Sequence, residues 1–146
     1  MDNYKKNEKY KELMVKLKKS IHNDFYYESI FIEYAILEDR TESILRHAKL
    51  STINNKGLPL TLNNKLNKIK NSSFYKNKYI NKHINNDLIE LIYEWKNKRN
   101  SLIHDLIKST YTNDELKEIA LDGYEIVKRI NNKSTLVNKY LDNNYN

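Results

Sequence analysis

Hydrophobic residues recur at spacings of three and four along most of the chain, with lysine, glutamate and asparagine between them. This spacing places apolar side chains on one face of an α-helix. It predicts helices at about 4–20, 24–50, 62–71 and 87–109, and a further helix from about residue 113. We therefore expect an all-α, single-domain bundle of four to five helices around one core.

The most regular of these segments is 87–109, whose apolar face comprises Leu88, Leu91, Ile92, Trp95, Leu102, Ile103 and Leu106. This helix is expected to lie in the core. Shorter signals suggest where other helices begin and end. Asn23 and Asp24 are candidate N-caps, and Thr112-Asn113-Asp114-Glu115 has the form of a capping box. The glycine and the proline of segment 51–60 predict a turn.

Gly123 falls on the apolar face of the last helix, where a missing side chain would let a neighbouring helix approach closely. Beyond Asn131 and Asn132 we expect this helix to end or to continue for one or two more turns. The domain is predicted to span residues 1–141, with a disordered tail at 142–146.

The length and the composition narrow the class of protein. A chain of 146 residues suits one domain, and the absence of cysteine excludes disulfides and thiolate chemistry. The first residues lack the apolar stretch of a signal peptide, and no apolar run is long enough to cross a membrane. The sequence is thus expected to be cytoplasmic, with no membrane partner.

The formal charge of +7 is compatible with a polyanionic partner. Lysine, asparagine, isoleucine and tyrosine are also enriched by AT-rich coding, so the charge alone leaves nucleic-acid binding open. Segment 65–82 interleaves lysines with Phe74, Tyr75 and Tyr79, a pattern that can follow a nucleic-acid backbone and stack on bases. The lysines are Lys65, Lys68, Lys70, Lys76, Lys78 and Lys82. The alternative is a solvated, compositionally biased loop.

Candidate chemistry lies near the end of the 87–109 segment, at Arg99-Asn100-Ser101-Leu102-Ile103-His104. Arg99 falls about 40° from Trp95 around the helix, and His104 about 180° from it. In one straight helix the two side chains cannot converge. They can share a site if the helix bends or if two copies meet about a two-fold axis.

This motif resembles that of HEPN domains, small helical-bundle ribonucleases of toxin–antitoxin, abortive-infection and CRISPR-associated defence systems. The match includes the asparagine that many members carry after the arginine. The late position of the motif in an all-helical chain is also similar. Beyond these features the resemblance is one of architecture.

The resemblance implies a metal-independent endoribonuclease that requires no cofactor and acts as a homodimer with the two motifs facing each other. His104 would be the base toward an RNA 2′-hydroxyl, and Arg99 would stabilise charge on the phosphorane. Asn100 would orient a phosphate or the imidazole. The product would be a 2′,3′-cyclic phosphate, and an antitoxin or other defence protein would be a further partner. Unlike members with a modifiable tyrosine two residues after the histidine, this chain has Leu106.

Histidine suits the role of base because its pKa lies near neutrality. Arginine suits the role of charge stabiliser because its planar, permanently charged fork matches phosphate oxygens. The histidines show no metal-ligand spacing in the sequence, so no metal is expected.

A second set of polar residues borders the apolar face of the 24–50 helix: Glu33, Asp39, Arg40 and His47. One interpretation makes them supporting groups in the same cleft, with Glu33 or Asp39 pairing Arg99. The other, which we favour, is an ordinary charged helix edge. Two functional alternatives to catalysis are a non-catalytic HEPN-like module that binds RNA or protein and an unrelated helical adaptor or DNA-binding bundle. No helix-turn-helix signal supports DNA binding.

Overall fold

The computed structural model describes residues 2–108 and 110–144. Within these ranges the chain forms six α-helices, a 3₁₀ helix and no strand. The α-helices are α1 (Asn3–His22), α2 (Tyr26–His47), α3 (Leu62–Asn71), α4 (Lys78–His83), α5 (Asn86–His104) and α6 (Asn113–Asn144), and the 3₁₀ helix is Ser73–Lys76. The all-α prediction is confirmed, but the predicted number of four to five helices is too low, because α4 was not predicted.

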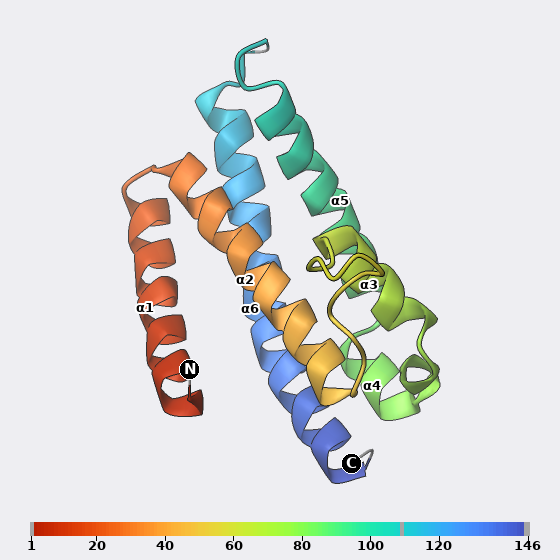
Figure 1. The fold of residues 1–146 in the computed structure, drawn as a ribbon. Coiled ribbons are helices and arrows are strands. Elements are labelled where there is room, and N and C mark those ends of the chain that lie inside the picture. The colour runs from red at the N-terminus through yellow and green to blue at the C-terminus, as the bar shows by residue number, and fades with distance from the viewer. Residues whose placement is uncertain (1, 109, 145–146) are drawn as a thin grey trace.

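Helices α2 and α6 form the centre of the bundle and run side by side in the same direction (Figure 1). Helix α1 packs against α2 on one side, and α5 packs against α6 on the other and runs in the opposite direction. The C-terminal end of α5 thus lies at one end of the bundle. The N-terminus of α1 and the C-terminal ends of α2 and α6 lie at the other end.

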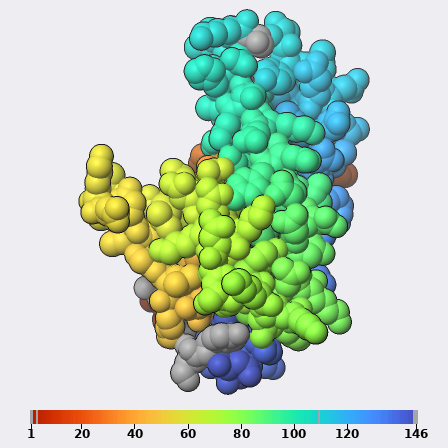
Figure 2. Space-filling model, turned by 90° about the vertical axis from the view of Figure 1, so that its right-hand side faces the viewer, coloured from red at the N-terminus to blue at the C-terminus, as the bar shows by residue number. Residues whose placement is uncertain are grey.

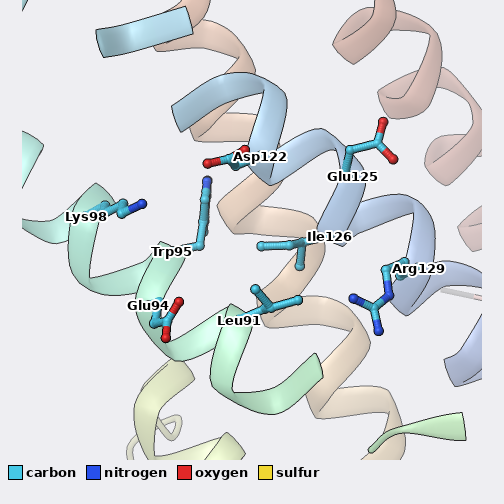
Figure 3. Close-up of a pocket in the computed structure, with 8 residues that line it drawn as sticks. All are labelled: Leu91, Glu94, Trp95, Lys98, Asp122, Glu125, Ile126 and Arg129. Carbon is cyan, nitrogen blue, oxygen red and sulfur yellow. The ribbon is translucent and has the colours of Figure 1, made fainter. Parts of the chain in front are cut away.

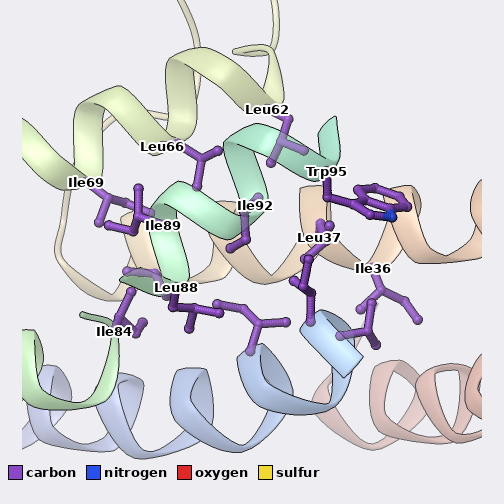
Figure 4. Packing of buried hydrophobic residues seen from close by; sticks show 14 of the residues in the cluster. Ile36, Leu37, Leu62, Leu66, Ile69, Ile84, Leu88, Ile89, Ile92 and Trp95 are labelled. Carbon is purple, nitrogen blue, oxygen red and sulfur yellow. The ribbon is translucent and has the colours of Figure 1, made fainter. Parts of the chain in front are cut away.

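Helix α3 has the predicted bounds. The spacing of its apolar residues also shows most clearly which side of a helix packs against the core. Leu62, Leu66 and Ile69 recur at spacings of four and three residues, and all three are almost fully buried. They face Ile89 and Ile92 of α5 (Figure 4). Fully burying one such side chain contributes about 1.5–3 kcal/mol, so this short helix is stabilised mainly by its core face.

The predicted N-cap of α6 is found in the structure, whereas those of α2 are not. Glu115 donates its backbone N–H to Thr112 Oγ1 at 3.1 Å, and the Thr112 hydroxyl donates to Glu115 Oε1 at 3.2 Å, so Thr112 caps the start of α6 and pairs with Glu115, the two residue types of a capping box. The prediction that Asn23 or Asp24 caps α2 is wrong: Phe25 is the N-cap, and Asp24 adopts a left-handed backbone with φ 61°. Instead, Asp24 accepts a hydrogen bond from the Tyr26 hydroxyl.

Helix α6 is longer than predicted and continues without a break through Asn131 and Asn132. It continues because Val137 and Leu141 extend the apolar face and are fully buried. Residues 142–144 form its last turn, so the prediction of a disordered tail is wrong for these three residues. Residues 145–146 lie outside the described ranges.

Segment 72–85 is not a solvated loop. It forms the 3₁₀ helix and α4, and four of its apolar side chains are buried: Phe74, Tyr75, Ile80 and Ile84. By contrast, the 51–60 connection stands out from the body of the molecule (Figure 2). It turns at Gly57, whose φ of 76° favours a residue without a side chain. Among the helices of the described ranges, none has an apolar stretch that could span a bilayer.

Candidate active site

Helix α5 carries the Arg99–His104 motif and is fixed at several points. Its N-cap, Asn85, accepts the Leu88 backbone N–H at 2.8 Å. In its middle, the Trp95 indole is buried and donates to the Ile119 carbonyl of α6 at 2.8 Å. The helix ends at His104, before the predicted residue 109, with Asp105 as its C-cap. Residue 109 itself lies outside the described ranges.

Arg99 lies one turn after Trp95 and is half-buried. Its guanidinium carbon lies 3.8 Å from the centre of the Tyr34 ring on α2, a cation–π contact. Nη1 donates to Asn100 Oδ1 at 3.1 Å, whereas Nε is buried and has no hydrogen-bond partner among the described residues. The aromatic ring therefore explains how a charged residue is accommodated beside the core.

His104 is exposed at the C-terminal end of the helix. Five residues of α-helix separate it from Arg99 by about 140° around the axis and about 7.5 Å along it. Within the described residues the two side chains share no hydrogen bond. A single copy of the chain thus brings Arg99 and Asn100 together but leaves His104 apart.

Several apolar side chains near this end of the bundle are exposed. After the motif, Ile107 is 98% exposed, and Ile103 and Leu106 are about half exposed. On α2, Tyr27 and Phe31 are also exposed. Since these two residues precede Tyr34 at helical spacing, they share a face with the ring that holds Arg99. We call this group of five residues the upper apolar patch.

The cavity nearest to the motif in sequence lies between α5 and α6 (Figure 3). Its volume is about 230 Å³. The side chains that line it are Leu91, Glu94, Trp95, Lys98, Asp122, Glu125, Ile126 and Arg129. Three carboxylates against two cations do not make a basic groove, and neither Arg99 nor His104 lines it.

Glu33 of α2 lies deep in the bundle, beside Trp95 of α5 and Gly123 of α6. A side chain on Gly123 of α6 would place its Cβ 2.3 Å from Glu33 Oε1 and 2.8 Å from Trp95 Cε2, which confirms the close approach expected at this glycine. Glu33 is fully buried, and neither of its carboxyl oxygens has a hydrogen-bond partner among the described residues. Burial and, less strongly, the charge of Asp122 raise its pKa to about 10. Glu33 thus does not pair with Arg99.

Asp39, Arg40 and His47 lie on the C-terminal half of α2, toward α1 and α6 rather than toward the motif. Asp39 accepts hydrogen bonds from Arg40 and lies 3.3 Å from Lys6 Nζ. Burial would raise the pKa of Asp39, but Arg40 and Lys6 lower it below its usual value. The interpretation in which Asp39 pairs Arg99 is therefore wrong, and the residues do not share one cleft with the motif.

The predicted RNA-binding lysines are not equivalent. Lys65 is 4% exposed, because its aliphatic chain packs in the core and its Nζ donates to the Glu38 carbonyl at 3.2 Å. Its assignment as a backbone-binding residue is wrong. Lys68 donates to the Ser51 carbonyl at 2.8 Å, and Lys70 lies 3.2 Å from Glu90 Oε1. Both remain partly accessible.

Lys76, Lys78 and Lys82 are exposed around the 3₁₀ helix and α4. The aromatic residues between them do not form a base-stacking surface. Phe74 and Tyr75 are buried, and the Tyr79 ring stacks on Tyr140 of α6 with 4.5 Å between the centroids. Any contact of this segment with a nucleic acid would therefore be made by the lysines.

In the part of the chain that the structure describes, no three histidine, aspartate or glutamate side chains cluster in a way that could hold a metal ion. The chain matches no protein-family model, no curated protein and no solved structure.

Proposed function

We propose that this chain is a metal-independent endoribonuclease of the HEPN type that acts as a homodimer. The observation that carries the proposal is the Arg99-Asn100-x-x-x-His104 motif at the C-terminal end of α5. There, a guanidinium is held on an aromatic ring and an imidazole is open to solvent. Arginine and histidine are the residue types that RNA cleavage through the 2′-hydroxyl requires.

The reaction proceeds by internal transfer at phosphorus. His104 accepts the proton of the 2′-hydroxyl, and the 2′-oxygen attacks the adjacent phosphorus. The bond from phosphorus to the 5′-oxygen breaks, and this oxygen takes a proton from an imidazolium, which leaves a 2′,3′-cyclic phosphate and a 5′-hydroxyl. Arg99 stabilises the extra negative charge on the phosphorane oxygens.

In the proposed homodimer, Arg99 and His104 of different copies would come together. A two-fold contact through the upper apolar patch would cover Tyr27, Phe31, Ile103, Leu106 and Ile107, which one copy leaves exposed. The ends of the two α5 helices would then approach each other. His104 of one copy would meet Arg99 of the other, so that the composite site contains two imidazoles and two guanidinium groups.

Cleavage of a labelled single-stranded RNA in EDTA, with end-group analysis of the products, tests this proposal. We expect wild-type protein to produce the cyclic phosphate and His104→Ala to reduce the rate by about 10²–10⁴-fold, the usual contribution of a general base. Arg99→Ala should reduce it similarly. His22→Ala is a matched control, because His22 is also an exposed histidine at the end of a helix, α1.

Three results would contradict the proposal. Cleavage that persists in His104→Ala would place the activity elsewhere. Equal activity of monomer and dimer fractions would remove the composite site. RNA binding without cleavage by a folded dimer would favour the non-catalytic binding module.

The setting that we propose is a toxin–antitoxin or antiviral defence system, with an antitoxin or other defence protein as partner. If cleavage acts on cellular RNA, expression of the wild type should slow growth. Expression of His104→Ala to the same level should not.

A further inference from the structure

A second polar cavity lies at the end of the bundle opposite the motif. It is lined by the N-terminal part of α1 and the C-terminal parts of α2 and α6, and its volume is about 550 Å³. Basic side chains from three helices converge on it: Lys6 comes from α1, Arg40, Arg46 and His47 from α2, and Lys139 from α6. We call it the three-helix pocket.

Positive charge predominates among the residues that line the three-helix pocket. Four of them carry a permanent positive charge, and Asp142 is the one carboxylate among them; it contacts His47 Nδ1 at 2.6 Å. Arg40 and Lys6 are partly neutralised by Asp39, which lies just outside the lining.

Two cations remain available to a ligand. Arg46 lies 3.8 Å from Glu42 in an exposed contact of the kind that contributes little. Lys139 is exposed and forms no ion pair with a described residue. The pocket therefore retains an excess of positive charge at its mouth.

The floor of the pocket is polar and incompletely satisfied. Asn138 is 8% exposed, and its amide nitrogen donates to Ser43 Oγ at 3.0 Å. Its amide oxygen is buried and has no hydrogen-bond partner among the described residues. If the amide is turned over, its oxygen accepts from Ser43 and its N–H₂ is left free, so in either orientation one polar group of Asn138 lacks a partner.

We propose that the three-helix pocket binds the phosphate group of an organic phosphate. A phosphate accepts several hydrogen bonds and carries up to two negative charges, which suits cations that converge from three directions. The volume falls within the range of small-molecule sites. A pocket of this volume between three helices suits a compact ligand such as a mononucleotide. The site does not depend on RNA cleavage at Arg99 and His104.

Binding of adenosine 5′-monophosphate and of pyrophosphate, measured by isothermal titration calorimetry, tests the proposal, with adenosine as the probe that lacks phosphate. Lys139→Gln removes an exposed charge and should weaken binding of both phosphates about tenfold or more. Lys117→Gln is the matched control, since Lys117 is an exposed lysine on the same helix but lies outside the pocket. Arg99→Ala should leave binding unchanged, which separates this site from the proposed active site.

A 5′-phosphorylated RNA oligonucleotide forms the last arm of the experiment. If the oligonucleotide alone binds and Lys139→Gln weakens it, the phosphate site is upheld and its source is RNA. The proposal is overturned if none of the phosphates binds. It is also overturned if adenosine binds as well as its monophosphate, or if Lys117→Gln weakens binding as much as Lys139→Gln, which would indicate unspecific attraction to a basic chain.

Discussion

The buried carboxyl of Glu33 should make the protein less stable as the pH rises, and Glu33→Gln should abolish this dependence. Burial raises the pKa of Glu33 from an ordinary value of 4.5 to about 10, so the folded chain holds this proton at neutral pH. The unfolded chain, in which Glu33 is hydrated, releases it. Raising the pH therefore favours the unfolded state.

The magnitude follows from the difference in bound protons. This group's contribution to the free energy of unfolding is greatest below pH 4.5, falls as the pH rises through the interval between the two pKa values, and levels off above about 10. Within the interval the slope for one proton is about 1.4 kcal/mol per pH unit. Between pH 6 and pH 8, Glu33 should thus reduce the stability by about 3 kcal/mol, a substantial part of the usual stability of a domain.

Urea denaturation at pH 6, 7 and 8, followed by circular dichroism, measures this effect. Because glutamine does not titrate, Glu33→Gln should gain about 3 kcal/mol relative to wild type over these two pH units. Glu28→Gln, which removes an exposed carboxylate from the same helix, controls for the change in net charge. Equal pH dependence in wild type and Glu33→Gln would refute the reasoning, because Glu33 would then be ionised in the folded chain.

Two further substitutions test the packing around α2. In Gly123→Ala, the new Cβ would lie 2.3 Å from Glu33 Oε1, so we expect a net loss of about 1–2 kcal/mol despite the better helix propensity of alanine; a rise in the urea midpoint would contradict the close approach. Lys65→Met keeps the buried aliphatic chain but loses both the hydrogen bond to the Glu38 carbonyl and the ion pair with Glu38 Oε2 at 3.7 Å. It should reduce stability by about 1 kcal/mol and leave RNA affinity unchanged, and a clear loss of affinity in a filter-binding assay would restore Lys65 as a contact.

The sequence predicts most reliably where a helix has one strong apolar face. For α3, the positions of Leu62, Leu66 and Ile69 are sufficient to indicate the helix and the side that is buried. In segment 72–85 the spacing of apolar residues does not predict burial, because Phe74 and Tyr75 lie in a 3₁₀ helix that is too short to show a helical period. Their burial depends on the neighbouring helices, which the local pattern does not describe.

Local sequence patterns also do not show which polar residues of different helices come together. The sequence singles out Arg40 and His47 as polar positions beside an apolar face, but gives no sign that they meet Lys6 and Lys139. Those lysines lie far apart in sequence, and lysine is so abundant in this chain that no single one stands out. Which lysines gather depends on how α1 and α6 flank α2, a property of tertiary packing.

The position of Arg99 depends both on the periodicity of its own helix and on packing against α2. Helical periodicity places it close to the apolar face, where an arginine needs a partner that tolerates both its aliphatic chain and its charge. Tyr34 is that partner, because an aromatic ring offers an apolar surface and a negative face to the guanidinium. Since the ring lies on α2, packing within one chain sets the orientation of the arginine. His104 has no such support among the described residues of one chain, so the proposed homodimer would have to supply it from a second copy.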